Sequence, residues 1–316
     1  MMVGNTPLVE VDGIFAKLEC VNPTGSIKDR IAKYIIEESE KKGLLSSGMK
    51  IVEATSGNTG IGLSYFSKLK GYDLTIVMPE NMTEERKRIM RELGANLILC
   101  SKEGSFAEAA KIRDKIAEKE GYFNPDQFSN PLNVECHEKT TGVEILSGLE
   151  KYSDKPIDCF VAGVGTGGTL IGVGKALKKK FPNVLIVAVE PSESQVMAGG
   201  SGGEHFIQGI GDGFIPAIAG NGNGGLNPLI GRVECVSSEE ALGAAKEIQE
   251  KHGFCVGVSS GANFLVAKKL QKEFQTIVTV FPDGYKKYES FGLTHSCGRC
   301  SCECKRLNVL SENCNN

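Results

Sequence analysis

Short apolar segments alternate with longer amphipathic segments along most of the chain. Apolar runs such as DLTIVMP (73–79) end at polar loops, and the segments that follow, such as TEERKRIMRELGA (83–95), repeat apolar residues at helical spacing. Strands that alternate in this way with amphipathic helices form parallel sheets with helices on both faces. The pattern predicts strands at 49–54, 73–79, 96–100, 158–164, 184–190, 254–259 and 276–282. It predicts helices at 31–39, 58–71, 83–95, 105–121, 134–149, 167–180, 238–253 and 261–274.

Two irregular passages interrupt this alternation, one near 125–133 and a Gly-rich one at 199–225. The length of 316 residues suffices for one large or two ordinary domains. Together these features predict an α/β fold of two doubly wound parallel-sheet domains. We expect a smaller N-terminal domain over 22–132, a larger domain built from 1–21 and 133–290, and a Cys-rich tail over 291–316.

Charge and hydropathy exclude two classes of partner. A formal net charge of −3 and the lack of a dense Lys/Arg stripe argue against nucleic acid. No apolar run reaches the roughly 18 residues that span a bilayer, which argues against a membrane protein. The N-terminal MMVGNTPLVEVDG lacks the charged start and apolar stretch of a signal peptide. We therefore expect a cytoplasmic protein.

The 11 cysteines are unevenly distributed. Six in the body of the chain are interpreted as small buried hydrophobic residues: Cys20, Cys100, Cys136, Cys159, Cys235 and Cys255. The other five lie in the last part of the tail: Cys297, Cys300, Cys302, Cys304 and Cys314. The first four of these thiolates could bind zinc tetrahedrally, but two separated Cys-x-x-Cys pairs are lacking, so a disordered end is the alternative. We expect the tail to take no part in catalysis and assign no metal-binding residue.

Four loops at predicted strand–helix junctions are rich in Gly, Ser, Thr and Asn. They are NPTGSIK (22–28), TSGNTG (55–60), GVGTGGT (163–169) and GVSSGA (257–262). Backbone N–H groups at a helix start attract anions, and ligands of parallel sheets bind at the carboxyl ends of strands. Four such loops in one chain indicate a single polar cleft.

A dinucleotide-binding oxidoreductase is one interpretation of these loops. Gly163, Gly165 and Gly168 satisfy G-x-G-x-x-G after a strand, and Glu190 ends the next strand as a ribose-binding acid would. This interpretation leaves the loops at 22–28 and 55–60 without a role.

A serine hydrolase is a second interpretation. Ser259 lies in G-x-S-x-G between a predicted strand and helix, and Asp283 and His295 follow in the required order. However, too little chain follows Ser259 for the remaining strands of that fold, and His295 falls in the Cys-rich tail.

A pyridoxal phosphate (PLP) enzyme is the third interpretation, and it uses all four loops. PLP needs a lysine for a Schiff base, a phosphate-binding loop, a partner for the ring nitrogen and a donor to the ring hydroxyl. Lys28, the 165–169 loop, Ser259 and Asn58 could fill these four roles.

Long motifs along the chain resemble the cysteine synthase (O-acetylserine sulfhydrylase) and cystathionine β-synthase family. They are NPTGSIKDRIA, IVEATSGNTGIGL, MPENMTEERKRIM, DQFSNPLN, HEKTTGVEI, FVAGVGTGGTLIGVGKALK, AVEPSES, IQGIGDGFIP and VGVSSGANFLVAKK, in this order. The resemblance runs from about residue 4 to residue 283. It implies fold type II, with PLP in the cleft between two α/β domains. It also implies a homodimer and, as a further partner, serine acetyltransferase.

The resemblance assigns roles to individual residues. It implies that Lys28 is the Schiff-base lysine and the proton carrier, and that Ser259, with Ser260 as the alternative, faces the pyridine nitrogen. It implies that Asn58 bonds the ring hydroxyl. The implied phosphate-binding residues are Gly165, Thr166, Gly167, Gly168 and Thr169. The implied substrate-carboxylate residues are Thr55, Ser56, Thr59 and Gln127.

The reaction implied by the resemblance is β-replacement through an aminoacrylate, with cysteine made from O-acetylserine and sulfide. One residue departs from the sulfhydrylase pattern: GIGDGFIP carries Asp212 where the family usually has a small apolar residue. Asp212 is either a solvated loop residue or a substrate-site base towards an incoming thiol or water. Enzymes that use cysteine or serine as donor, and so release sulfide or form lanthionine or cystathionine, are therefore the alternative.

Overall fold

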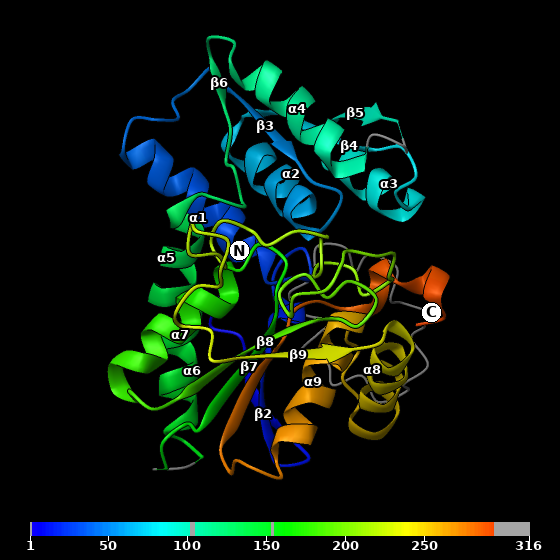
Figure 1. Cartoon of the computed structure of the whole chain (residues 1–316). Helices are drawn as coiled ribbons and strands as arrows, with labels where there is room; N and C mark the ends of the chain where they lie inside the picture. The colour runs from blue at the N-terminus through cyan, green and yellow to red at the C-terminus, as the bar shows by residue number, and fades with distance from the viewer. Residues whose placement is uncertain (1, 102–104, 153–154, 294–316) are drawn as a thin grey trace. The chain divides into compact units, whose positions relative to one another are not determined.

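The computed structural model describes residues 2–101, 105–152 and 155–293 (Figure 1). The chain divides into two compact units. Unit 1 combines Met1–Ile27 with Asn133–Asn316, and unit 2 comprises Lys28–Leu132. Each unit is built around a sheet of its own.

The sheet of unit 1 has six strands among the described residues, in the order β1-β2-β10-β7-β8-β9. They are β1 (Leu8–Val11), β2 (Ile14–Leu18), β7 (Cys159–Gly163), β8 (Leu185–Pro191), β9 (Arg232–Val236) and β10 (Ile277–Phe281). β1 pairs with β2 in antiparallel orientation, and the pairs from β2 to β9 are parallel. The β1–β2 turn contains Asp12 and Gly13, whose φ angles of 49° and 78° are those of a tight hairpin turn.

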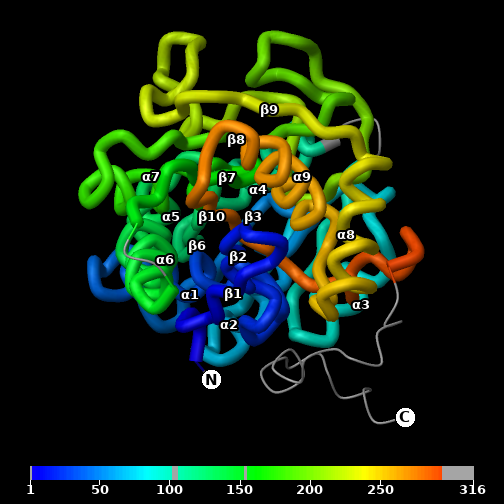
Figure 2. Tube along the Cα trace, turned by 90° about the horizontal axis from the view of Figure 1, so that it is seen from below, coloured from blue at the N-terminus to red at the C-terminus, as the bar shows by residue number. Residues whose placement is uncertain are grey.

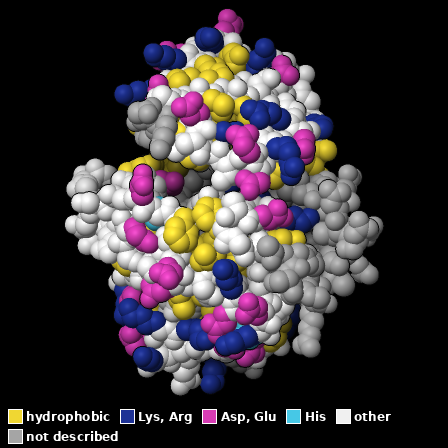
Figure 3. Space-filling view, turned by 90° about the vertical axis from the view of Figure 1, so that its right-hand side faces the viewer, with side chains coloured by type: hydrophobic (Ala, Val, Ile, Leu, Met, Phe, Trp, Pro, Cys, Tyr) yellow, Lys and Arg dark blue, Asp and Glu magenta, His cyan; other side chains and the backbone are white. Residues whose placement is uncertain are grey.

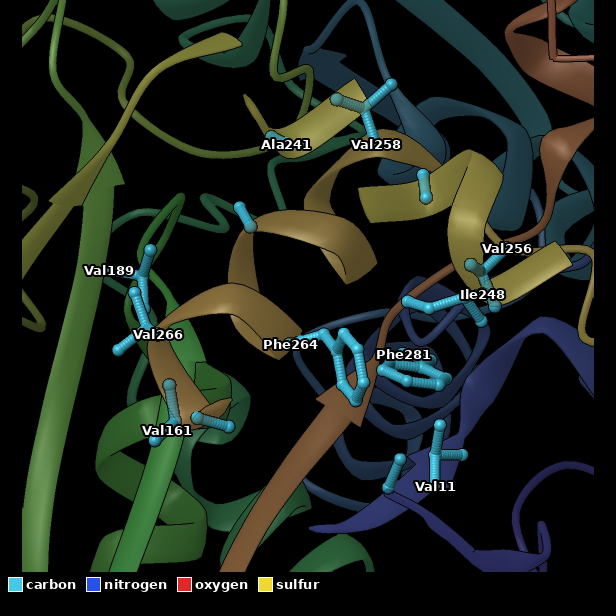
Figure 4. Close-up of a cluster of buried hydrophobic side chains, with 14 of the residues drawn as sticks. Val11, Val161, Val189, Ala241, Ile248, Val256, Val258, Phe264, Val266 and Phe281 are labelled. Carbon is cyan, nitrogen blue, oxygen red and sulfur yellow. The ribbon is translucent and has the colours of Figure 1, made fainter. Parts of the chain in front are cut away.

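Helices cover both faces of this sheet (Figures 1 and 2). α8 (Ser238–His252) and α9 (Val258–Leu270) pack on one face, and α6 (Thr141–Leu149) and α7 (Gly168–Lys180) pack on the other. On the α9 face, the rings of Phe264 and Phe281 meet edge to face with their centroids 6.3 Å apart (Figure 4). Because central strands face helices on both sides, β10 (IVTVF) is buried at every position.

Unit 2 contains a four-stranded parallel sheet in its described part, in the order β5-β4-β3-β6. The strands are β3 (Lys50–Ala54), β4 (Asp73–Pro79), β5 (Asn96–Cys100) and β6 (Tyr122–Phe123). The helices are α1 (Lys28–Lys41), α2 (Asn58–Lys70), α3 (Glu84–Glu92) and α4 (Ser105–Ala117). Val52, Ala54 and Val77 pack against α4, whereas Ile51 and Ile76, which alternate with them, are buried on the opposite face.

The predicted elements are found with three differences. The helix predicted at 134–149 is two helices, α5 (Pro131–Lys139) and α6, which meet at Thr140. The strand predicted at 254–259 is wrong: this segment makes only an isolated bridge between Val256 and Gly284, and α9 already begins at Val258. Strands β1, β2, β6 and β9 were not predicted: β1 and β2 form a hairpin and do not alternate with helices, and β6 and β9 are short or flanked by irregular chain.

Residues 22–27 lie in unit 1, although the sequence assigned them to the smaller domain. The Ile27 N–H donates to the Pro282 carbonyl at 2.8 Å, and Ser26 forms a bridge with Asp283. These contacts hold the segment against the chain that follows β10. The boundary between the units therefore falls immediately before Lys28.

The six body cysteines are free thiols, five of them buried and Cys235 half-buried. The tail cysteines and His295 lie outside the described residues. In the described part of the chain, no helix has both the length and the apolar character needed to cross a bilayer. The face drawn in Figure 3 carries interspersed acidic and basic side chains with hydrophobic patches between them.

Candidate active site

Four helices begin at the loops that the sequence singled out. α1 begins at Lys28 and α2 at Asn58 in unit 2, while α7 begins at Gly168 and α9 at Val258 in unit 1. The first turn of a helix has N–H groups without intrahelical partners, and these favour anionic ligands. The expected link between these loops and helix N-termini is thus found within each unit.

The 165–169 loop joins β7 to α7 in unit 1. Gly167, the N-cap of α7, has a φ of 84°, in the left-handed region that glycine adopts without strain. A Cβ on Gly165 would lie 2.2 Å from the Gly209 carbonyl oxygen, and a Cβ on Gly168 would lie 1.8 Å from Asn133 Oδ1. Only glycine fits these two close approaches, which keep backbone N–H groups together at the start of a helix, as phosphate binding requires.

Two side chains of α5 hold the hydroxyls of this loop. Asn133 Nδ2 donates to Thr166 Oγ1 at 3.0 Å, and His137 Nε2 lies 3.3 Å from Thr169 Oγ1. His137 is fully buried, and its Nδ1 lies 2.9 Å from Thr141 Oγ1. The sequence interpretation missed both Asn133 and His137. The histidines show no catalytic spacing, and Asn133 lies at the end of the irregular passage near 125–133. The available signal was the polar pair His137 and Thr141, four residues apart within a predicted helix.

Asp212 lies on a glycine-rich loop beside the 165–169 loop in unit 1. The Gly211 N–H donates to the Val164 carbonyl at 3.0 Å, and Asp212 Oδ2 would lie 3.8 Å from a Cβ on Gly165. The Asp212 side chain itself is exposed. Three residues of this loop have positive φ: Gly209 (93°), Gly211 (72°) and Gly213 (80°).

The carbonyl that precedes Asp212 is held from two sides. His205 Nε2 lies 2.8 Å from the Gly211 carbonyl oxygen, and Ser194 Oγ donates to the same oxygen at 3.3 Å. A Cβ on Gly211 would lie 2.5 Å from Pro191 Cδ, so the backbone there is also closely packed. The path of this loop is therefore set by contacts with the Gly211 backbone.

Ser259 and Ser260 lie in the first turn of α9 and are both buried. Ser260 Oγ has no hydrogen-bond partner among the described residues, an unusual state for a buried hydroxyl. The neighbouring Gly261 packs against α8, where a Cβ would lie 2.0 Å from the Ala241 carbonyl oxygen. The first turn of α9 therefore presents hydroxyls from a helix whose position is tightly constrained.

The described residues give the two rival interpretations no support. Asp283 accepts a hydrogen bond from Tyr288 Oη at 2.7 Å and lies against Gly257, while its supposed partner His295 is outside the described residues. Glu190 is buried and accepts from the N–H groups of Met197 and Ala198 at 2.9 and 2.8 Å. Glu190 thus holds the backbone of the segment that follows β8. This structural role accounts for a buried acid at the end of β8, so a ribose-binding role is not needed to explain it.

The 55–59 loop of unit 2 carries three of the expected substrate residues. Thr59 Oγ1 donates to Gln127 Oε1 at 2.6 Å, and both side chains are buried. Arg86, a buried residue of α3, donates to the Ser56 carbonyl at 3.3 Å. Thr55 is buried, and its Oγ1 accepts from the Gly57 N–H at 3.3 Å. Arg86 was also missed on the sequence.

A buried carboxylate lies directly before this loop. Glu53 Oε2 accepts from the Gln127 N–H at 3.1 Å, Oε1 accepts from the Ala54 N–H at 2.9 Å, and Arg113 Nη1 lies 3.3 Å from Oε1. Burial raises the pKa of Glu53 to about 7, because desolvation outweighs the attraction of Arg113 and the two N–H donors. Glu53 and Arg113 were missed because a lone Glu at a strand end is usually a solvated residue.

Lys28 is half-buried as the first residue of α1. Its carbonyl oxygen lies 3.3 Å from the place of a Cβ on Gly62, and Ala32 Cβ lies 3.2 Å from the same place. The start of α1 therefore packs closely on α2, whose first residue is the half-buried Asn58. Unit 2 thus brings Thr59 and Gln127 together, and unit 1 brings Asp212 to the 165–169 loop.

A family model described as pyridoxal-phosphate dependent enzyme matches residues 1–283. The chain belongs to this family. A cysteine synthase of Staphylococcus aureus is 42% identical over 301 residues, which cover 92% of this chain and 94% of that protein.

Solved structures of the same kind are similar over nearly the whole chain. O-acetyl serine sulfhydrylase isoform 3 of Entamoeba histolytica has a TM-score of 0.84 at 37% identity and covers 97% of this chain and 94% of that one. A hydrogen sulfide-producing enzyme of Fusobacterium nucleatum has a TM-score of 0.86 at 40% identity, over 92% of this chain and 89% of that one. The predicted family, fold class and cofactor are confirmed: this is a PLP-dependent enzyme of the β-replacing type with the fold of type II enzymes.

The residues present fit the cofactor. The glycine backbone and the two threonines at the N-terminus of α7 would hold a phosphate, and Cβ atoms on Gly165 and Gly168 would collide with neighbours there. The buried hydroxyl of Ser260 lacks a partner in the described structure, which suits a polar group of a bound molecule.

Proposed function

We propose that this enzyme makes cysteine from O-acetylserine and sulfide by β-replacement. The observation that carries the proposal is the 42% identity to a cysteine synthase over 92% of the chain. It is supported by the glycine loop at the start of α7, which is built for a phosphate, and by the Thr59–Gln127 pair of unit 2.

Lys28 is the proposed attachment point of the cofactor. When bound, PLP withdraws electrons from the α-carbon of an amino acid, which makes loss of the α-proton and of a β-substituent feasible. The Nζ of Lys28 holds the cofactor between turnovers, and once released it takes the proton from the α-carbon and returns it at the end. Its place in the first turn of α1, which packs closely on α2, limits the directions that this side chain can take.

The remaining cofactor contacts are assigned to helix starts. The 165–169 loop, with Gly165, Thr166, Gly167, Gly168 and Thr169, binds the phosphate through N–H groups and hydroxyls, and Asn133 and His137 orient the two threonines. Asn58 donates to the ring hydroxyl. Ser259 faces the ring nitrogen, and the unpartnered Oγ of Ser260 among the described residues makes Ser260 the alternative.

Thr55, Ser56, Thr59 and Gln127 bind the α-carboxylate of the substrate. The Thr59 hydroxyl donates to Gln127 Oε1, so the amide NH₂ of Gln127 is its donating end. The guanidinium of Arg86, which donates to the Ser56 carbonyl, adds positive charge next to this loop. N–H groups at the start of α2 complete a site that is selective for an anion.

The proposal is tested by reducing the purified protein with borohydride and mapping its peptides by mass spectrometry. PLP should be found attached to the peptide that contains Lys28. Lys28→Ala should abolish cysteine formation and retain the fold, whereas Lys33→Ala, at a partly exposed position of the same helix, should keep full activity. A colourless wild-type protein, or PLP attached elsewhere, would refute the proposal.

A second candidate reaction is release of sulfide from cysteine. Asp212, beside the 165–169 loop, favours it, since an exposed carboxylate there could deprotonate a thiol or water. The similar Fusobacterium nucleatum structure is of a hydrogen sulfide-producing enzyme. Side-by-side assays of O-acetylserine with sulfide, of cysteine alone, and of serine with homocysteine distinguish the candidates.

We further propose, from the family resemblance, that the enzyme is a homodimer, that it binds serine acetyltransferase and that it acts in the cytoplasm. The residues 28–132 are proposed as the smaller domain and those of unit 1 as the PLP-phosphate-binding domain. Size-exclusion chromatography with light scattering, alone and with a serine acetyltransferase, checks the first two statements.

A further inference from the structure

A buried set of polar residues supports the 55–59 loop of unit 2. The Glu53 network consists of Glu53, Arg113, Asp126, Gln127 and Thr59. Three of its side chains are almost wholly excluded from solvent: Glu53 at 0%, Gln127 at 4% and Thr59 at 4% exposure. A charge so deeply buried destabilises a protein unless it is compensated, so its presence needs a reason.

The two oxygens of Glu53 hold two different pieces of backbone. Oε1 accepts from the Ala54 N–H, which lies at the end of β3 one residue before the 55–59 loop. Oε2 accepts from the Gln127 N–H, 74 residues further along the chain. The carboxylate thus ties the backbone of Gln127 to the strand that leads into the 55–59 loop.

Arg113 completes the connection from α4. Its guanidinium lies 3.3 Å from Glu53 Oε1, 3.5 Å from Asp126 Oδ1 and 2.8 Å from Asp114 Oδ1. Asp126 has a φ of 47°, a left-handed conformation that aspartate adopts at a cost. Arg113 therefore helps to hold the strained residue that directly precedes Gln127.

The outcome is a fixed direction for the Gln127 amide. Its backbone is held by Glu53, and its Oε1 accepts from Thr59 Oγ1 at 2.6 Å. The NH₂ end of the amide, which can only donate, is thereby turned away from Thr59. An NH₂ donor that is already held in place favours the binding of an anion, because the side chain loses little conformational entropy on binding.

We propose that Glu53 is a positioning residue for the α-carboxylate of the amino-acid substrate, acting through Gln127 and Thr59. This inference rests on the proposed function, in which Gln127 and Thr59 bind that carboxylate. Glu53 itself touches no substrate. Its carboxylate sets the geometry of the site in its ionised form only, because protonation replaces one acceptor by a donor that faces an N–H group.

Glu190 provides a matched control in unit 1. It too is a buried glutamate at the end of a parallel strand, and it too accepts from two backbone N–H groups. Its two carboxylate oxygens accept from the N–H groups of residues 197 and 198, which belong to unit 1. Glu190→Gln therefore disturbs a buried carboxylate that holds two backbone N–H groups, as Glu53→Gln does, but it leaves the support of Gln127 unchanged.

The test uses PLP-loaded protein and L-alanine, which has an α-carboxylate but no β-leaving group. The change in visible absorption on titration measures its dissociation constant, and ethylamine, which lacks the carboxylate, is titrated in parallel. Glu53→Gln should weaken alanine binding about tenfold or more, as expected for loss of a hydrogen bond to a charged group, and leave ethylamine binding unchanged. Glu190→Gln should change neither.

The pH dependence and the kinetics separate positioning from stability. In the wild type, the ratio of alanine affinity to ethylamine affinity should fall as the pH falls below about 7, as the Glu53 carboxylate is protonated, because loss of the amine proton affects both ligands alike; Arg113, Asp114 and Asp126 are the other charged groups of the cluster. Glu53→Gln should remove this dependence and raise KM for O-acetylserine with kcat within about threefold. Glu53→Asp, which keeps the charge, should recover part of the affinity.

Unchanged alanine binding in Glu53→Gln, or an equal loss for ethylamine, would overturn the inference. If Glu53→Gln does not fold, Arg113→Lys takes its place, since it keeps the charge and loses the fork that holds Asp126. Failure of the proposed function has a different signature: the wild type would neither bind alanine with a spectral change nor turn over O-acetylserine.

Discussion

The free energy of unfolding should depend on pH through Glu53 in a direction opposite to that of an ordinary surface carboxylate. The carboxyl group is fully buried, and desolvation raises its pKa from 4.5 to about 7 in the folded protein. The folded state therefore binds a proton more tightly than the unfolded chain does. Glu53 contributes its full stability below about pH 4.5, and this contribution is lost as the pH rises through about 7.

The size of the effect follows from these two pKa values. Linkage between protonation and unfolding gives a loss of about 2.5 kcal/mol between about pH 5 and about pH 8 for a group whose pKa moves from 4.5 to about 7. Glu53→Gln cannot titrate, so its stability lacks this contribution. The difference in unfolding free energy between wild type and variant should thus shift by that amount against the wild type as the pH rises.

Urea-induced unfolding of the PLP-loaded wild type and variant, followed by circular dichroism across this pH range, is the appropriate measurement. The part of the offset in unfolding free energy that does not vary with pH includes the effect of lost hydrogen bonds and carries no information on titration. Only the change of the offset with pH does. An offset that stays flat within about 0.5 kcal/mol, or that changes in the opposite direction, would show that Arg113 keeps Glu53 ionised and that the reasoning on its burial is wrong.

Three further predictions concern single residues. Gly168→Ala should weaken PLP binding at least about tenfold in reconstitution of the apoprotein, because its Cβ would lie 1.8 Å from Asn133 Oδ1; unaltered affinity would contradict the assignment of this loop. Gly261→Ala should lower Tm through a loss of about 1–3 kcal/mol, since its Cβ would lie 2.0 Å from the Ala241 carbonyl oxygen; an unchanged Tm in calorimetry would mean that α8 shifts freely. Asp212→Asn should spare addition of sulfide, which is largely anionic near neutral pH, and should slow reactions with an organic thiol or water by on the order of 100-fold. Equal rates for wild type and Asp212→Asn with every acceptor would make Asp212 a solvated loop residue.

Most elements and the candidate loops could be predicted because they depend on local signals. The alternation of apolar runs and amphipathic segments located β3, β4 and α2 nearly to the residue, since strands buried on both faces are apolar throughout. Glycine-rich junctions predicted the starts of α2 and α7, and at α7 the N-cap Gly167 has a φ of 84°, a conformation that favours glycine.

The failures have non-local causes. FCVGVS at 254–259 has the composition of a strand, but tertiary packing starts α9 at Val258 instead. Asn133 and His137 act on threonines more than thirty residues away, and Glu53 acts on Gln127 across 74 residues. No local pattern distinguishes such a buried polar residue from a solvated one.

In the loop around Asp212, the path of the backbone does not depend on the side chain at position 212. Its course follows from three glycines with positive φ, from the hydrogen bond between Gly211 and Val164, and from the hold of His205 and Ser194 on the Gly211 carbonyl. These contacts belong to the backbone and would survive replacement of Asp212. A substitution at position 212 would therefore remove the proposed base alone and leave both the course of its own loop and the neighbouring 165–169 loop intact.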